Sequence, residues 1–187
     1  MSHAFPAQVL DGTKGRDVLF AYTSDNGPRI DDALAGLGGD VGPFTRGGKW
    51  GPYEGGHRMP LLLRWPGRVA PGSTAALASL MDLFPTFLSA GGAKRPKRVP
   101  LDGVDLAPLF AESPRRRDER ALRPGLLVHS GAAARVGRFK VFLKAHKTTR
   151  ALDVFDVALG ADEGESYPLK NATLVRRLQR ATRGLVA

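Results

Sequence analysis

Short apolar runs that end in polar turns organise the first half of the chain. Residues 17–23, Asp-Val-Leu-Phe-Ala-Tyr-Thr, are mostly apolar or aromatic and lead directly into the polar stretch 24–28, Ser-Asp-Asn-Gly-Pro. This pattern predicts a buried strand followed by a turn. A second strand is expected over residues 59–65. It lies within residues 38–72, where ten Gly and five Pro among 35 residues exclude a regular helix and predict a shaped loop, a place where function commonly resides.

Two short helices separated by a linker are expected next. The first runs from Asp82, its candidate N-cap, to Gly91, its C-terminal stop, and tolerates Pro85 in its first turn. Residues 94–100 are basic and contain proline, which is typical of a linker. Residues 101–110 then predict a turn with a short capped helix.

After residue 110 the pattern predicts short strands. In the central one, Phe139, Val141 and Leu143 alternate with polar residues and therefore share one face. An acidic turn is expected after the last strand, over residues 160–166. The three predicted strands cover residues 126–129, 138–144 and 152–157.

The closing residues 173–183 predict an amphipathic helix with an arginine-rich outer face. Residues 113–150 are also basic, with eleven Arg or Lys and two acidic residues, and the whole chain has a net charge of +10 from 28 basic and 18 acidic residues. Aromatic residues do not interleave with these charges, so we interpret them as a solvated surface and do not expect nucleic acid as a partner. The inward residues of the helix are Leu174, Val175, Leu178 and Ala181, and the outward ones are Arg176, Arg177, Arg180 and Arg183.

Composition narrows the possible chemistry. The 187 residues are 42% hydrophobic, which is ordinary for a globular protein. Cysteine is absent, which excludes disulfides, Cys-ligated zinc, iron–sulfur clusters and a cysteine-derived nucleophile, and leaves the redox compartment undetermined. The N-terminal residues do not resemble an export signal, and no apolar run approaches the roughly 20 residues of a membrane helix. We therefore expect no membrane partner, and the compartment is unknown.

Candidate chemistry concentrates between residues 24 and 66. Asp25 and Asn26 directly follow the first strand, and their hard oxygen ligands suit Ca²⁺ or Mg²⁺, although the same residues are also ordinary turn formers. Lys49 follows two glycines, which allow an oxyanion to approach both the backbone and the ammonium group. A phosphate-binding P-loop is excluded because Pro43 replaces its first glycine and Trp50 its final Ser or Thr.

Six stretches of this sequence, in order and spacing, resemble the second half of the sulfatases, and within that family the branch of arylsulfatase A and N-acetylgalactosamine-6-sulfatase. The similarity covers roughly residues 8–170, and the succession of Lys-x-x-x-Tyr-Glu-Gly-Gly and Trp-Pro-Gly is its most specific part. The matching stretches are residues 23–28, 42–60, 64–67, 81–86, 101–106 and 154–169.

The resemblance implies an α/β, alkaline-phosphatase-like fold, incomplete here, with a small C-terminal antiparallel sheet plus helix. Residues 1–110 would be the C-terminal part of the catalytic domain, and residues 111–187 a small subdomain. It further implies sulfuric ester hydrolysis, with Asp25 and Asn26 ligating calcium and Lys49 contacting the sulfate and the leaving oxygen.

The resemblance implies supporting roles for other residues of the matched glycine loop. Glu54, Gly55 and Gly56 are expected to turn and pack the loop. His57 is a candidate substrate contact, although its position looks variable in the family, so we expect it beside the site or facing solvent.

The family nucleophile has no counterpart in this sequence. In sulfatases a formylglycine forms from the first residue of Cys/Ser-x-Pro-Ser-Arg, and neither cysteine nor this motif occurs here. Calcium takes six to eight oxygens, so two ligands predict weak binding. We therefore expect no activity from the chain alone and a missing N-terminal half as its partner, besides a sulfate ester substrate. Family members are usually secreted, periplasmic or lysosomal.

Two other classes of function stay open. One is a non-enzymatic module that keeps the geometry of the anion-binding loop. The other is a basic nucleic-acid-binding protein built on residues 113–150 and 173–183, which would show a steep dependence of affinity on salt.

Overall fold

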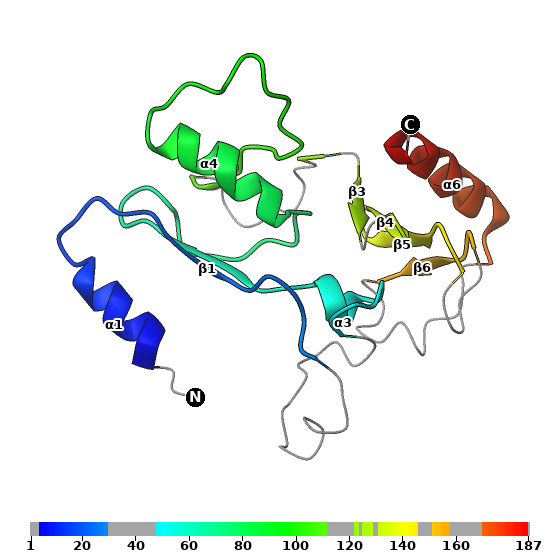
Figure 1. Ribbon diagram of the computed structural model, residues 1–187, viewed down its shortest axis with the longest axis horizontal. Helices are drawn as coiled ribbons and strands as arrows, with labels where there is room; N and C mark the ends of the chain where they lie inside the picture. The colour runs from blue at the N-terminus through cyan, green and yellow to red at the C-terminus, as the bar shows by residue number, and fades with distance from the viewer. Residues whose placement is uncertain are drawn as a thin grey trace. The chain divides into compact units, whose positions relative to one another are not determined.

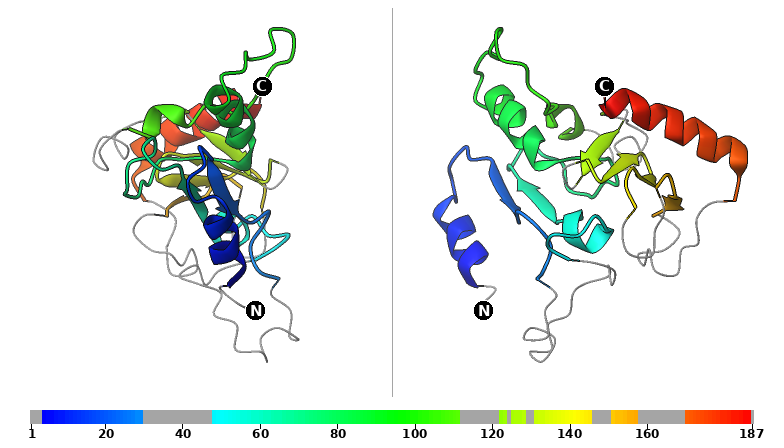
Figure 2. Two further views of the ribbon diagram at one scale, coloured as in Figure 1. Left: turned by 90° about the vertical axis from the view of Figure 1, so that its left-hand side faces the viewer. Right: turned by 45° about the vertical axis from the view of Figure 1, so that its right-hand side comes forward.

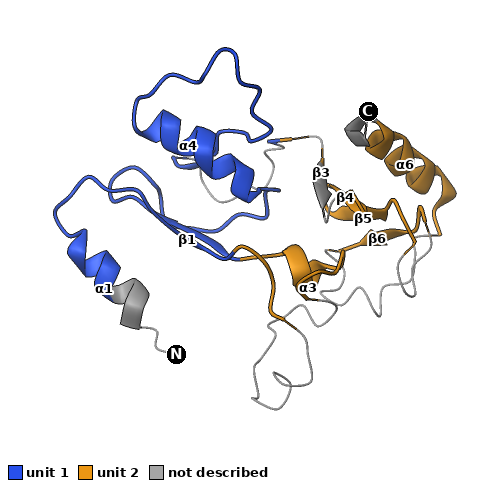
Figure 3. Ribbon diagram, in the orientation of Figure 1, with its two compact units in different colours: residues 1–24, 60–122 blue, residues 25–59, 123–187 orange. Residues whose placement is uncertain are grey.

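The computed structural model describes residues 4–29, 48–111, 122–123, 125–128, 131–145, 151–157 and 170–186 (Figure 1). The chain folds into two compact units, each with a core of its own. Unit 1 comprises residues 1–24 and 60–122, and unit 2 comprises residues 25–59 and 123–187 (Figure 3). The predicted acidic turn over 160–166 and the basic run over 113–121 lie outside the described residues, as does the glycine loop up to residue 47.

Unit 1 is built on a two-stranded antiparallel ribbon. Strand β1 (Phe20–Thr23) pairs with β2 (Leu61–Arg64), which confirms both predicted strands with shorter bounds. A helix that the sequence pattern did not predict, α1 (Ala4–Gly12), precedes β1. Tyr22 lies directly opposite Leu62, and both side chains are exposed.

The core of unit 1 covers the other face of this ribbon. Leu61 and Leu63 alternate with exposed neighbours, so they point to one side, where they pack against a buried cluster. Within that cluster the Trp65 and Phe110 rings meet edge to face, with their centroids 6.4 Å apart. The buried cluster consists of Trp65, Leu106, Leu109 and Phe110.

The predicted N-cap residue of the first helix lies at the expected position, but its side chain bonds elsewhere. A 3₁₀ turn, η1 (Leu80–Asp82), precedes α4 (Leu83–Ala90), and Asp82 makes no side-chain cap to α4. Its buried carboxylate instead accepts the Ser79 N–H at 2.7 Å and the Val104 N–H at 2.8 Å. Asp82 therefore holds the predicted N-cap position of α4, but its side chain serves the preceding turn and a segment 22 residues away.

The C-terminal end of α4 is as expected. The Gly91 N–H donates to the Phe87 carbonyl at 2.9 Å and ends α4. The predicted short capped helix is a 3₁₀ turn, η2 (Ala107–Leu109), whose N-cap residue Leu106 makes no side-chain cap. The Asp105 carboxylate accepts the Ala107 N–H at 2.8 Å instead.

Unit 2 contains a four-stranded antiparallel meander in the order β3-β4-β5-β6. Three of its strands confirm predictions, with shorter bounds: β3 (Leu126–Val128), β5 (Phe139–Phe142) and β6 (Val154–Asp156). The fourth, β4 (Ala133–Val136), was missed because alanine has little strand propensity, and here Ala133 and Ala134 are fully buried. The helix α6 (Ala172–Val186) packs across β3, β4 and β5 (Figure 2).

The sheet of unit 2 is covered on both faces. As predicted, Phe139, Val141 and Leu143 share one face, and they pack against Leu178 of α6. On the same helix Ala181 is exposed and Thr182 is buried, so the predicted inward position is wrong by one residue. Thr182 satisfies its hydroxyl within the helix by donating to the Gln179 carbonyl at 2.9 Å, and so costs little to bury.

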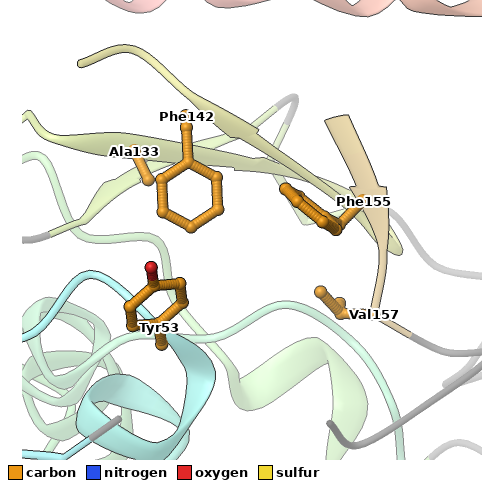
Figure 4. Packing of buried hydrophobic residues seen from close by; sticks show 5 residues of the cluster. All are labelled: Tyr53, Ala133, Phe142, Phe155 and Val157. Carbon is orange, nitrogen blue, oxygen red and sulfur yellow. The ribbon is translucent and has the colours of Figure 1, made fainter. Parts of the chain in front are cut away.

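The opposite face of the sheet packs against the residue before the short helix α3 (Glu54–His57). The Tyr53 and Phe142 rings lie 5.5 Å apart between centroids, and Phe142 and Phe155 meet edge to face at 5.6 Å (Figure 4). Because both faces of the sheet are covered, apolar residues of β5 and β6 point to either side, and the buried Lys140 of β5 is tolerated only with a charged partner.

Among the described residues, none of the helices has both the length and the apolar character that crossing a membrane requires. The division of the chain into domains at residue 110 stays a prediction.

Candidate functional site

Three separate segments of unit 2 meet through their backbones around the residues singled out from the sequence. The Gly27 N–H donates to the Gly56 carbonyl at 3.1 Å, and the Lys49 N–H donates to the Pro28 carbonyl at 2.9 Å. The first bond joins the turn that contains Asp25 to helix α3, and the second joins it to the turn that contains Lys49. The candidate residues therefore belong to one local structure.

Glycine is required where these segments touch. A Cβ on Gly27 would overlap the carbonyl oxygen of Gly55, and a Cβ on Gly56 would overlap that of Gly48. Both obstacles are backbone atoms, which cannot swing aside as a flexible side chain can. The glycines of the loop thus permit close backbone approach, in agreement with the packing role expected for them.

The two candidate metal ligands form a compact turn at the start of unit 2. The Asp25 carboxylate accepts the N–H of Asn26 at 2.9 Å, and the Asn26 side-chain amide donates to the Gly27 carbonyl at 2.9 Å. Asp25 is exposed and Asn26 is partly buried.

The chemistry of this donor set fits part of a hard-cation site and no more. A carboxylate and an amide offer the oxygen ligands that Ca²⁺ and Mg²⁺ prefer, but a calcium ion takes six to eight of them. In the described part of the chain, no group of three or more His, Cys, Asp or Glu residues could hold a metal ion. Asp25 and Asn26 stay predicted ligands of a site that these residues do not complete.

Lys49 lies at the second position of a β-turn that the Gly51 N–H closes by donating to the Gly48 carbonyl at 3.0 Å. Trp50 occupies the third position with a φ of 70°, in the left-handed region. The Lys49 Nζ lies 5.3 Å from the centroid of the Trp50 ring, and the Arg29 Cζ lies 5.4 Å from it. Arg29 and Trp50 were not singled out from the sequence, which gives no sign that these side chains meet.

His57 is the last residue of α3 and is partly buried. It directly follows Gly56, whose carbonyl accepts the bond from Gly27, so it belongs to the same local structure as Asp25 and Lys49. Its contact with substrate stays a prediction.

A buried ion cluster anchors this structure to the sheet. The Glu54 carboxylate pairs with Lys140 of β5 at 3.1 Å and with Arg135 of β4. The side chains of Glu54 and Lys140 are 5% and 0% exposed. Glu54 opens α3, so the cluster fixes the helix that carries Gly56 and His57.

The charge state of Glu54 follows from this environment. Burial by itself opposes ionisation, but the positive charges and hydrogen bonds of Lys140 and Arg135 outweigh it and hold the pKa of the carboxyl below its ordinary value. Glu54 is therefore a carboxylate at neutral pH. The sequence predicts a packing role for Glu54 but gives no sign of its partners 81 and 86 residues away.

Comparison with solved structures defines the class of fold. A structure whose title concerns the metabolism of multiple glycosaminoglycans by Bacteroides thetaiotaomicron matches with a TM-score of 0.74 and 23% identity, over 96% of this chain and 41% of that chain. A structure titled as that of Ps i-CgsB matches with a TM-score of 0.67 and also 23% identity. The fold is the α/β, alkaline-phosphatase-like fold of the sulfatases, as expected, and the match covers less than half of the solved chain.

Sequence comparison then identifies the family. Residues 7–93 match the family model described as Sulfatase. The chain is 44% identical to human arylsulfatase A over 103 residues, 54% of this chain and 20% of the relative. It is 35% identical to human arylsulfatase G over 179 residues, 86% of this chain and 32% of the relative. Mouse N-acetylgalactosamine-6-sulfatase is 46% identical over 94 residues, 50% of this chain and 18% of the relative.

The chain belongs to the sulfatase family. It spans no more than about a third of the length of these relatives, since the matched shares are 20%, 32% and 18%. The expected branch of arylsulfatase A and N-acetylgalactosamine-6-sulfatase is among the relatives found.

Proposed function

We propose that this chain supplies one side of an arylsulfatase-type site for sulfuric ester hydrolysis. Lys49 is its catalytic and sulfate-binding residue, Asp25 and Asn26 are calcium ligands, and His57 lies at the margin of the substrate. The observation that carries the proposal is the pair of backbone hydrogen bonds, from Gly27 to Gly56 and from Lys49 to Pro28, that draws these residues together.

Sulfate ester hydrolysis requires positive charge near the sulfate group, and these residues can supply or bind it. Hydrolysis consumes water, breaks an S–O bond and releases an alcohol and hydrogen sulfate, so negative charge develops on the departing oxygen. The Lys49 ammonium group, about hydrogen-bond distance from that oxygen, would offset this charge. A bound Ca²⁺, or Mg²⁺ in its place, would withdraw charge from the sulfate oxygens. Asp25 and Asn26 would supply two of its ligands.

The proposed site needs a second sulfatase segment. The sequence has no cysteine and no Ser-x-Pro-Ser-Arg, so the formylglycine nucleophile must come from elsewhere, and we expect the other calcium ligands to come from the same segment. Exposed apolar side chains in unit 1 support such a partner: Tyr22 and Leu62 are 44% and 61% exposed on one face of the ribbon, and Phe84 and Phe87 of α4 are 54% and 44% exposed. We propose that this segment is the N-terminal half of a sulfatase.

The chain by itself is therefore expected to be inactive. Incubation with 4-nitrophenyl sulfate and calcium should release no nitrophenol above the blank. Turnover above the blank that disappears in both Lys49→Ala and Asp25→Ala would show that the 187 residues contain a complete site, and would overturn the inference of an absent nucleophile.

Sulfate binding tests the proposed site without requiring turnover. Titration with inorganic sulfate should shift the backbone amide resonances of Gly48 and Gly51 saturably, because Lys49 lies between them. Removing one charge-assisted hydrogen bond in Lys49→Ala should weaken binding by about tenfold or more. The matched control is Lys97→Ala in the exposed linker, which should leave the affinity unchanged. Equal affinity in the two variants would refute the assignment of Lys49.

The exposed arginines of α6 support a second candidate, a nucleic-acid-binding protein. They form the solvent face of the helix, as predicted, which is also the ordinary place for charged residues. Binding of a mixed-sequence RNA or DNA with a steep salt dependence would favour this candidate, and affinity that Lys49→Ala leaves intact would separate it from the sulfatase site. The arginines are Arg176, Arg177, Arg180 and Arg183.

A further inference from the structure

Trp50 adopts a backbone conformation that its side chain does not favour. Its φ of 70° lies in the left-handed region, where glycine and asparagine are common and a bulky residue is an outlier. It occupies the third position of the Gly48–Gly51 turn, a position that glycine often fills when φ is positive.

Burial does not compensate for this conformation, because the Trp50 side chain is 67% exposed. A tryptophan that is both strained and exposed gains little for the fold from its large apolar surface. Backbone outliers of this kind concentrate at binding sites, where the surrounding structure holds a side chain in position for a ligand. The exposed ring therefore points to a role in binding.

Two cations lie over this ring. The Lys49 Nζ and the Arg29 Cζ are 5.3 Å and 5.4 Å from its centroid, within the range of cation–π contacts. The cluster thus presents two positive charges and one exposed aromatic surface. A small anion could use the charges alone, whereas an anion attached to an aromatic ring could contact the indole as well.

We propose that Arg29, Lys49 and Trp50 form a subsite for sulfate esters of aromatic alcohols. Arg29 and Lys49 contact the sulfate group, and the Trp50 indole contacts the aromatic ring of the alcohol. Trp50 is then the residue that favours aryl over alkyl esters. This assignment rests on the proposed function only in taking Lys49 as a sulfate-binding residue.

The chain has a built-in reference for testing this subsite, since it contains two tryptophans. Trp65 is 8% exposed in unit 1, and its indole N–H donates to the Asp17 carboxylate. Its resonance should therefore not respond to a ligand at Trp50. Phenyl sulfate and methyl sulfate are the probes, because they carry the same anion on an aromatic and on an alkyl group.

Titration with phenyl sulfate should shift the indole N–H resonance of Trp50 and leave that of Trp65 in place. The full chain should bind phenyl sulfate about two- to tenfold more tightly than methyl sulfate, the range expected for one aromatic contact. Arg29→Ala should weaken binding of both esters by a similar factor, since the anion is common to them.

Two substitutions of Trp50 separate binding from folding. Trp50→Gly should abolish the preference for phenyl sulfate without lowering the free energy of unfolding, because glycine readily takes a positive φ. Trp50→Phe should retain part of the preference. Backbone amide shifts report the affinities of these variants.

The outcomes distinguish this subsite from the proposed function. If Lys49→Ala weakens the binding of both esters but Trp50→Gly leaves the preference unchanged, the aromatic subsite is wrong and the role of Lys49 stands. If neither ester shifts the resonances around Lys49, both inferences fail.

Discussion

Replacing the buried carboxylate of Glu54 with an amide tests whether the ion cluster of unit 2 holds the candidate site in place. In Glu54→Gln the side chain keeps its shape, while Lys140 and Arg135 lose the negative charge that they share. The ammonium group of Lys140 is 0% exposed and cannot turn to water without unpacking the sheet. The variant therefore leaves positive charge in an apolar interior.

The expected loss of stability is large. Breaking a buried ion pair by removing one partner costs about 3–5 kcal/mol. The glutamine oxygen still accepts a hydrogen bond, so we expect the lower end, about 3 kcal/mol. A domain is stable by only about 5–15 kcal/mol, so this loss would remove roughly a fifth to three fifths of the free energy of unfolding of unit 2.

Urea unfolding followed by circular dichroism measures this loss, and amide exchange localises it to unit 2. The Phe142 N–H of β5, which donates to the Asp153 carbonyl at 2.9 Å, is the reporter. Asp11→Asn is the matched control, because Asp11 pairs with Lys14 on the surface, where an ion pair contributes less than about 1 kcal/mol. A loss for Glu54→Gln no larger than that of the control would refute the reasoning.

The pH dependence gives an independent check. The pKa of Glu54 is lower in the folded protein than in the unfolded chain, so the ionised carboxylate stabilises the fold. This contribution is complete above the ordinary pKa of a glutamate and is lost as the pH falls through the lower pKa of the folded state. The difference in stability between the wild type and Glu54→Gln should therefore shrink in acid. A difference in stability that stays constant from pH 7 to about pH 3 would contradict this stabilising role of the ionised Glu54 carboxylate.

Three further outcomes follow from individual contacts. Gly27→Ala places a methyl group on the Gly55 carbonyl and should cost about 1–3 kcal/mol, measured by urea unfolding. A silent substitution would mean that the turn containing Asp25 does not touch α3. Asn171→Ala removes the side-chain oxygen that accepts the Leu174 N–H at 3.0 Å and should lower stability by about 1 kcal/mol, with helical ellipticity lost from α6 as the check. Phe84→Ser should reduce self-association in sedimentation velocity without loss of stability, because Phe84 is 54% exposed. Unchanged sedimentation would argue against self-association through this exposed apolar surface.

Local sequence determined much of the secondary structure and the identity of the candidate residues. Strands β1, β2, β5 and β6 follow from short apolar runs, because alternation along a strand is encoded within a few residues. The motif that contains Lys49 and the turn at Asp25 are likewise contiguous in the chain, so they could be found without knowing what they contact. The absence of cysteine can likewise be established from the sequence without a structure.

Other features depend on residues that are distant in sequence. Asp82 looks like the N-cap of α4, but its carboxylate is taken by Ser79 and by Val104, and no local pattern shows the second partner. Strand β4 has weak strand propensity. It forms because both faces of the sheet are covered, and there the small side chains of Ala133 and Ala134 are fully buried. Whether such a side chain caps a helix, or such a segment forms a strand, depends on packing against several elements.

The site itself divides in the same way. The sequence by itself named Asp25, Asn26 and Lys49, because their chemistry resides in the residue types and their immediate neighbours. Only the tertiary structure joined their turns, through the bond from the Lys49 N–H to the Pro28 carbonyl. It alone gave Glu54 its two cationic partners, the buried Lys140 and the partly buried Arg135, and placed two cations over the Trp50 ring. The physical reason is that backbone contact and charge pairing act through space, between residues whose separation along the chain carries no signal.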